Sequence, residues 1–185
     1  MLLDRHQSQL LIVDIQERLV PAMTAPEDLI AQVQKLCAGA RELAVPITVS
    51  EQYPKGIGAT VGAVREAAGN GARMFDKLHF SCARDEKIAM RINELGHVHQ
   101  RQQLVICGIE SHVCVLQSAV DFQAAGYQVA VVADAVSSRS DHSKTIALDR
   151  LRQNGVNIVT TEMVLFEWLE VAGTEQFRTV SKLIK

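Results

Sequence analysis

Three side chains that could supply a base, a fixed cation and a nucleophile stand far apart in the chain: Asp14, Lys77 and Cys114. Asp14 lies in the apolar run LLIVDIQ, where a carboxylate is costly unless it is paired, so it has either a capping role or a chemical one. Cys114 is expected in the first turn of a helix, where the helix dipole lowers the pKa of a thiol and favours the reactive thiolate. Taken singly, each has an ordinary alternative, because a lone cysteine is usually an inert buried thiol and a lysine a solvated surface residue.

The elements that must position these residues alternate between strands and helices. The nearly continuous apolar run at residues 9–15 is typical of a strand covered on both faces, and further strands are predicted at residues 47–50, 73–75, 104–108, 128–133 and 156–160. Helical patterns occur at residues 28–44, 61–68, 85–94, 111–125, 141–153, 161–169 and 175–184. Five or six strands with crossover helices predict an α/β fold of three layers (α/β/α) around a doubly wound, mostly parallel sheet.

The predicted sheet indicates which polar residues are candidates for a functional site, because ligands of open parallel sheets bind beyond the carboxyl ends of the strands. Asp14 lies near the end of the first predicted strand, and Cys114 follows the fourth by six residues. The connection 51–70 contains Pro54 and four glycines. Long connections of this kind are usually binding surfaces or lids, so this one is expected to shape the site.

Composition restricts the class of protein. A chain of 185 residues that is 48% hydrophobic and 22% charged is expected to form one domain, residues 1–185, with a substantial core. A formal net charge of -2 leaves no basic field to gather phosphates, so nucleic acid is not expected as a partner. The four cysteines are widely spaced without a CxxC pair, which predicts neither a zinc site nor a disulfide framework.

The N-terminal segment MLLDRHQSQLLIVDIQERL differs from a signal peptide, because an acid and two bases precede only a short apolar run. No stretch reaches the roughly 18 consecutive apolar residues of a membrane helix. We therefore expect no membrane partner and a cytoplasmic location.

Several motifs together carry a family resemblance. VDIQ at residues 13–16, FDKLHFS at 75–81 and CGIESHVCV at 107–115 resemble the isochorismatase-like cysteine hydrolase superfamily, which includes nicotinamidases and N-carbamoylsarcosine amidase. EQYPKGIG at 51–58 and DAVSSRS at 134–140 are most similar to the isochorismatase domain-containing proteins. The resemblance covers nearly the whole chain, and the motifs fall in the expected order.

The resemblance implies a catalytic triad of Asp14, Lys77 and Cys114. In this triad the Lys77 ammonium favours the Cys114 thiolate, and the Asp14 carboxylate takes up the thiol proton and returns it to a leaving amine. The resemblance also implies a cis peptide between Ile109 and Glu110. The backbone N–H groups of Glu110 and Cys114 would then form an oxyanion hole.

The sequence departs from the nicotinamidases at their metal site. Those proteins resemble one another in an Asp-x-His plus His set after the second strand, whereas this chain has SEQY at residues 50–53. We therefore predict no catalytic metal and no cofactor, and nicotinamide is a doubtful substrate. The residues expected to line the substrate pocket, or alternatively to pack the loop or face solvent, are Gln16, Gln52, Tyr53, Phe80 and His112.

The expected activity is metal-independent hydrolysis of a small amide, ureide or related carbonyl compound through a thioester on Cys114. Hydrolysis of isochorismate itself cleaves a vinyl ether and needs no cysteine nucleophile, so the family name does not give the substrate. A catalytically idle oligomeric scaffold and a redox-responsive thiol protein, with Cys82 close to Lys77 in sequence, stay open as alternatives. The resemblance implies a homo-oligomer, for which the apolar residues in 165–169 offer a surface unless they cover the sheet.

Overall fold

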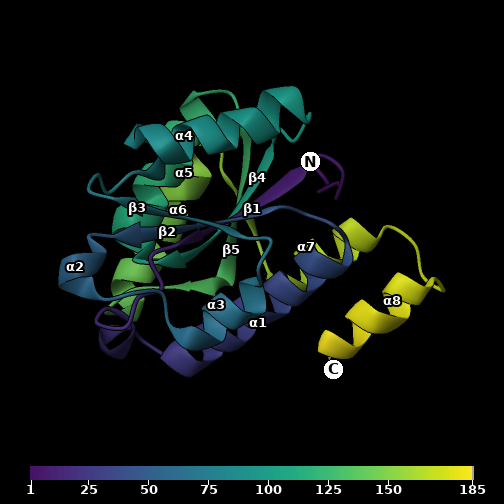
Figure 1. The fold of residues 1–185 in the computed structure, drawn as a ribbon, viewed down its shortest axis with the longest axis horizontal. Helices are drawn as coiled ribbons and strands as arrows, with labels where there is room; N and C mark the ends of the chain where they lie inside the picture. The colour runs from purple at the N-terminus through teal and green to yellow at the C-terminus, as the bar shows by residue number, and fades with distance from the viewer. Residues whose placement is uncertain (185) are drawn as a thin grey trace.

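Six parallel strands form the central sheet of the computed structural model, which describes residues 1–184 (Figure 1). Along the sheet their order is β3-β2-β1-β4-β5-β6. The strands are β1 (Ser8–Val13), β2 (Ile47–Gln52), β3 (Arg73–Lys77), β4 (Gln103–Ile109), β5 (Gln128–Ser137) and β6 (Asn157–Val159). The order reverses between β1 and β4, and this switch point is where the crossovers leave a crevice at the carboxyl ends of the strands.

Helices cover both faces of this sheet and complete the expected three layers (Figure 1). The helices that pack together on one face are α1 (Pro26–Glu42), α3 (Gly62–Ala68), α7 (Thr161–Leu169) and α8 (Glu175–Val180). Those on the other face are α4 (Glu86–Asn93), α5 (Leu116–Ala124) and α6 (Asp141–Gln153). A single-turn helix, α2 (Pro54–Ile57), lies in the long connection after β2 and was not predicted from the sequence.

The apolar run in β1 is buried on both sides, as a parallel central strand requires. Leu10 and Ile12 enter the core between the sheet and α1, whereas Leu11 and Val13 enter the core between the sheet and α5. The side chains alternate because successive residues of a strand point to opposite faces. Two apolar cores therefore hold the carboxyl end of β1 in place from both sides.

The first strand ends two residues earlier than the sequence predicted, because Asp14 leaves the extended conformation. Its φ is +51°, in the left-handed region that non-glycine residues seldom adopt. β3 and β5 extend further than expected, to Lys77 and Ser137. Asp14 and Lys77 thus both lie where a strand of the sheet stops.

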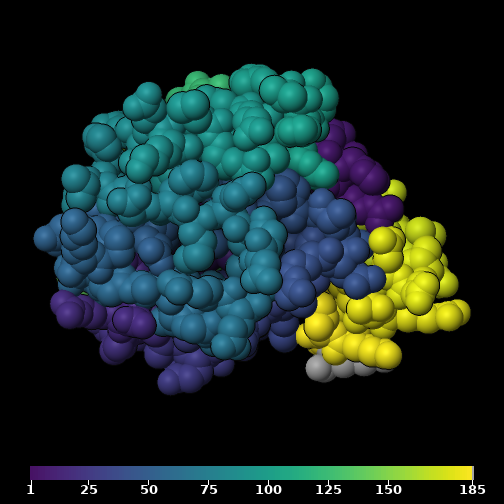
Figure 2. Space-filling view, viewed as in Figure 1, coloured from purple at the N-terminus to yellow at the C-terminus, as the bar shows by residue number. Residues whose placement is uncertain are grey.

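The N-terminal segment lies beside the C-terminal helices at one edge of the molecule, where purple atoms border yellow ones (Figure 2). The Leu3 N–H donates to a Glu167 carboxylate oxygen at 2.7 Å. In the segment 165–169, Leu165, Trp168 and Leu169 are buried and cover the sheet, while Phe166 is exposed. Most of this segment therefore belongs to the core of the protein.

Among residues 1–184, none of the helices has the length and apolar character needed to span a membrane.

Candidate active site

Asp14 and Lys77 form a buried ion pair at the carboxyl ends of β1 and β3. The Lys77 Nζ lies 2.7 Å from Asp14 Oδ2, and both side chains are 0% exposed. β2 separates the two strands, and its residues Ser50 and Gln52 complete the surroundings of the pair. We call Asp14, Ser50, Gln52 and Lys77 the carboxyl-end cluster.

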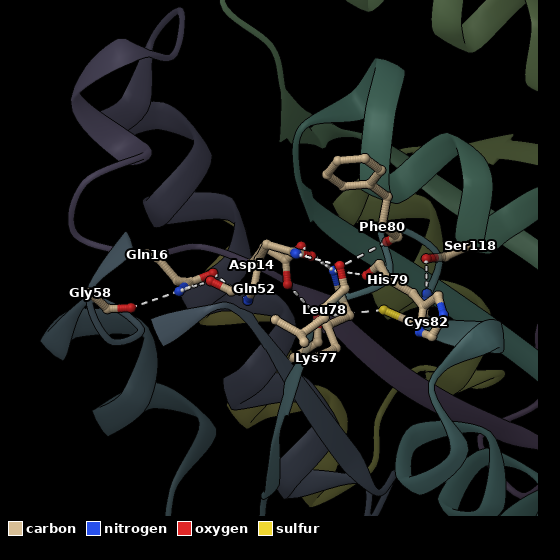
Figure 3. A network of polar contacts seen from close by, with 11 residues as sticks. Asp14, Gln16, Gln52, Gly58, Lys77, Leu78, His79, Phe80, Cys82 and Ser118 are labelled. Carbon is tan, nitrogen blue, oxygen red and sulfur yellow. Dashed lines mark hydrogen bonds and ion pairs between the residues drawn. The ribbon is translucent and has the colours of Figure 1, made fainter. Parts of the chain in front are cut away.

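The Lys77 ammonium is surrounded by oxygen acceptors, as Figure 3 shows. Besides Asp14, it donates to Gln52 Oε1 at 2.6 Å and to the backbone carbonyls of His79 and Phe80, each at 3.2 Å. An ammonium has three protons, so these acceptors account for all of its donor capacity. Lys77 is therefore held as a fixed positive charge.

The environment keeps Lys77 ionised. Burial alone lowers the pKa of the ammonium, but the Asp14 charge, with smaller contributions from the Cys82 and Cys114 thiols, outweighs this and leaves the pKa above its ordinary value. A buried charge is retained only where a partner offsets the loss of hydration. The positive charge next to Asp14 thus persists at neutral pH.

Cys114 lies in a π-helical turn, Ser111–Val115, that connects β4 to α5. Its side chain is buried with 7% exposure, and its thiol lies near enough to the Asp14 carboxylate for the carboxylate to affect its pKa. Burial raises the pKa of this thiol, Asp14 raises it further, and the opposite effect of Lys77 is smaller. The sequence-based expectation of a lowered pKa is wrong, because it counted the helix terminus and the lysine but not the removal of the thiol from water.

The backbone before Cys114 approaches β1 closely. At Gly108 φ is +119°, and a Cβ there would lie 2.1 Å from the Val13 carbonyl oxygen, so only glycine fits. The Ile109–Glu110 peptide bond is cis. The N–H groups of Val113 and Val115 both donate to the Glu110 carbonyl, at 3.0 and 3.2 Å, so the turn that carries Cys114 curls around this carbonyl.

Of the residues expected in the substrate pocket, Gln16 and Gln52 are committed to the protein. Gln16 is fully buried; it accepts from the Gln52 N–H at 2.7 Å and donates to the carbonyls of Gln52 and Gly58 at 3.0 and 2.6 Å (Figure 3). The Gln52 side chain donates to the Leu78 carbonyl at 2.8 Å and accepts from Lys77. These bonds tie the long connection to β1 and to the ion pair.

The other expected pocket residues lie nearer the surface. Tyr53 and Phe80 are more than half exposed, at 52% and 53%. In the sequence Tyr53 directly follows Gln52, and Phe80 lies shortly after Lys77. His112 is partly buried, and its Nδ1 lies 3.0 Å from the Ser138 hydroxyl. These three side chains are the ones of the predicted set that are free to meet a ligand from outside.

Two further neighbours of the ion pair are Ser50, which was not singled out from the sequence, and Cys82, which was named only for the redox-responsive alternative. The Ser50 hydroxyl donates to Asp14 Oδ1 at 2.7 Å, and the Cys82 thiol donates to Ser50 Oγ at 3.5 Å. Burial first and Asp14 second raise the pKa of Cys82 to about 11. The available signal was the parallel arrangement of β1 and β2, which brings the ends of both strands to one edge of the sheet.

Metal ligands do not gather at this edge. Within residues 1–184 no group of three or more His, Cys, Asp and Glu side chains is placed to hold a metal ion. Glu51, which stands near the position of the nicotinamidase metal set, instead accepts hydrogen bonds from the Thr60 N–H and hydroxyl at 2.7 and 2.8 Å.

Comparison with known protein sequences finds isochorismatase-family matches over most of the chain. The model of the isochorismatase domain family matches residues 8–163. The secreted isochorismatase effector Isc1 of Phytophthora sojae is 35% identical over 97% of this chain and 85% of its own length. Isochorismatase domain-containing protein 1 of Danio rerio is 39% identical over 93% of this chain, which spans only 59% of that longer protein.

Solved structures share the fold over the full length of the chain. The MAR1 ribonuclease of Caenorhabditis elegans has 32% identity and a TM-score of 0.91, with 100% of this chain and 92% of that chain covered. The YcaC gene product of Escherichia coli, described as an octameric hydrolase of unknown specificity, has 21% identity and a TM-score of 0.91, covering 100% and 89% of the two chains.

Proposed function

The chain belongs to the isochorismatase family, whose described members include hydrolases, and on that premise we propose that it hydrolyses a small amide, ureide or related carbonyl compound. Asp14, Lys77 and Cys114 form the catalytic triad, and the reaction needs no metal or cofactor. The observation that carries this proposal is the fully buried Asp14–Lys77 pair with the Cys114 thiol near enough to feel both charges. Burying an ion pair costs stability unless its geometry is excellent, so a function that uses the charges accounts for it better than packing does.

The raised pKa of Cys114 supports one order of events in the first step. Cys114 is a thiol at rest, and its proton passes to Asp14 as the sulfur attacks the carbonyl carbon of the substrate. The new S–C bond leaves a negative oxygen, for which we propose the Glu110 and Cys114 N–H groups as donors. Asp14 is then neutral and Lys77 still positive, so the net charge of the buried site does not change.

This conservation of charge is the reason for preferring a coupled proton transfer to a preformed thiolate. Losing the thiol proton to solvent would leave two negative groups, Asp14 and Cys114, beside the single positive charge of Lys77. Burial makes such an excess charge expensive. Lys77 therefore acts by holding Asp14 and by stabilising the negative charge that develops during attack.

The remaining steps return the site to its starting state. The tetrahedral intermediate collapses, the C–N bond breaks, and the proton held by Asp14 passes to the leaving nitrogen, which leaves a thioester on Cys114. Asp14 then accepts a proton from water as the water oxygen attacks the thioester carbon. When the C–S bond breaks, that proton returns to the sulfur and the carboxylic or carbamic acid is released.

The test is a screen of small amides and ureides, with ammonia or amine release as the signal, on wild type and on Cys114→Ser. We expect turnover only by wild type, together with an acyl adduct on the Cys114 peptide in quenched mass spectrometry. Equal turnover by both proteins would overturn the covalent mechanism. A folded wild type that turns over no amide would favour the idle scaffold. RNA belongs in the same screen, because one structural relative is described as a ribonuclease.

We also propose a homo-oligomer and a cytoplasmic location. For the oligomer, support comes from the exposed apolar side chains of Tyr53, Leu78 and Phe80 near the site and from a fold neighbour described as octameric. Sedimentation tests it, and a monomer at micromolar concentration contradicts it. The location rests on the N-terminal pattern alone, and one relative is described as secreted; fractionation of cells that express the protein decides it.

A further inference from the structure

We infer that Ser50 is a positioning residue that aims the Asp14 carboxylate at the Cys114 thiol. This inference rests on the proposed function of Asp14 as the base. Ser50 lies in β2 directly beside Val13 in the parallel register, and it is fully buried. It holds Asp14 at two points: its carbonyl accepts from the Asp14 N–H at 3.1 Å, and its hydroxyl donates to Asp14 Oδ1 at 2.7 Å.

The hydrogen bond from Ser50 to the main chain of Asp14 stabilises the Asp14 backbone conformation. A φ of +51° is unfavourable for a residue with a side chain, and such a conformation persists only where the surroundings impose it. The bond from the Asp14 N–H to the Ser50 carbonyl joins the first residue after β1 to β2. The main chain of Ser50 thereby fixes the point from which the Asp14 side chain starts.

The hydroxyl of Ser50 then fixes the orientation of the carboxylate. Asp14 Oδ2 is held by Lys77 at 2.7 Å and Oδ1 by Ser50 at 2.7 Å, so neither oxygen can rotate without breaking a charge-assisted bond. Lys77 alone would leave the carboxylate free to pivot about Oδ2. With both oxygens held, the carboxylate keeps one orientation relative to the nearby Cys114 thiol.

Cys82 determines which way the Ser50 proton points. A hydroxyl has one donor and two acceptor positions, and the Cys82 thiol donates into one acceptor position at 3.5 Å. The raised pKa of Cys82, about 11, keeps its proton on sulfur at neutral pH. Ser50 therefore accepts from Cys82 and donates to Asp14, and a reversed orientation would place two protons against each other.

β2 also supplies a matched control for Ser50. Thr48 lies two residues earlier on the same side of the strand and is likewise fully buried. Among the described residues its hydroxyl has no hydrogen-bond partner. Thr48→Val thus removes a buried hydroxyl from β2 without touching the carboxyl-end cluster, whereas Ser50→Ala removes the hydroxyl that binds Asp14.

The experiment measures the rate at which iodoacetamide modifies Cys114 near neutral pH, read from the Cys114 peptide by mass spectrometry. Attack on iodoacetamide also requires the thiol proton to leave, and under the proposed function Asp14 is the group that accepts it. We expect Ser50→Ala to slow modification about tenfold or more. Thr48→Val and Ser50→Thr, which keeps the hydroxyl at position 50, should stay near the wild-type rate.

Two results would overturn the inference: a Ser50→Ala rate equal to that of Thr48→Val, or equal slowing in Ser50→Ala and Ser50→Thr, which would assign the effect to packing. Once a substrate is known, Ser50→Ala should lower kcat with KM unchanged. The alkylation rates need no substrate, so they decide the role of Ser50 even where Cys114→Ser retains turnover and the proposed hydrolase mechanism fails.

Discussion

Buried polar groups lie at both ends of β1, but their partners differ. At the amino end, the Ser8 hydroxyl donates to Gln103 Oε1 at 3.1 Å and accepts from the Trp168 indole N–H at 2.9 Å. We call Ser8, Gln103 and Trp168 the amino-end cluster. At the carboxyl end, Asp14 enters the carboxyl-end cluster, with its charge opposed by Lys77. Side chains of both clusters are withdrawn from water to a similar degree.

The difference lies in charge. The amino-end cluster is neutral, and Gln103 uses its remaining groups on the backbone of Leu2 and Asp4, at 3.0 and 2.7 Å. Such a network ties the N-terminal segment and α7 to the sheet at little cost, because each polar group finds a neutral partner. The carboxyl-end cluster keeps two ions out of water, which stability alone does not require. Burial of polar groups is therefore common to both ends, and buried charge marks the end that is proposed to react.

The largest effect should follow from removing the cation. Lys77→Met leaves Asp14 as an uncompensated buried charge, so we expect a loss of about 3–5 kcal/mol in the free energy of unfolding and at least about a thousandfold in kcat/KM. Chemical denaturation and steady-state kinetics measure the two quantities.

The control for this variant combines Lys77→Met with Asp14→Asn, which removes both charges and keeps an acceptor for Ser50. We expect the double variant to recover most of the stability and none of the activity. Recovery of activity along with stability would show that the charges serve the fold, and the contrast between the two ends of β1 would break down.

A smaller effect concerns the thiols at alkaline pH. Burial first and Asp14 second raise the pKa of Cys82 to about 11, and burial raises that of Cys37, which lies in α1 away from both clusters, to about 12. Because an unfolded thiol ionises near 9.0, the unfolded chain loses these protons first. Stability is thus fully present below pH 9 and falls above it, up to about pH 11 for Cys82 and about 12 for Cys37.

The expected slope is about 1.4 kcal/mol per pH unit for each thiol. Urea denaturation at several pH values measures it, and Cys82→Ala or Cys37→Ala should each remove a similar share of the slope. If only Cys37→Ala does so, the pKa of Cys82 is the same in the folded and the unfolded chain, and Lys77 offsets the effects of burial and Asp14 on that thiol.

The smallest effect is expected at the amino end. Ser8→Ala removes two neutral hydrogen bonds and leaves the Trp168 indole without its acceptor, so we expect a loss of about 1–3 kcal/mol in stability. The value of kcat/KM should stay within about twofold of wild type once a substrate is known. A large fall in kcat/KM with stability preserved would mean that the amino-end cluster shares in catalysis, contrary to the comparison.

Periodicity and the alternation of strands with helices were enough to predict the layers, the parallel sheet and the edge of the sheet where a site was to be sought. The resemblance supplied the grouping of Asp14, Lys77 and Cys114. What the sequence did not give was the raised pKa of Cys114, because the water removed by distant elements is not visible in the turn that carries the thiol.

The residues around the triad were harder to interpret. Ser50 was overlooked because its importance comes from its register opposite Val13, and register is set by the whole sheet. Gln16 was expected near the substrate, yet its amide is consumed by Gln52 and Gly58. A glutamine in a loop looks the same in sequence whether its partners are a ligand or the backbone.

Gly108 limits how the proposed active site could be transferred to another protein. The side chains of the proposed triad come from the residue after β1, the end of β3 and the turn after β4, and grafting them onto a different parallel sheet looks sufficient on paper. The close approach of residue 108 to the Val13 carbonyl leaves no room for a Cβ, so a scaffold with any other residue there must open the β1–β4 seam. A designer would therefore have to specify four positions, one of which contributes no functional group at all.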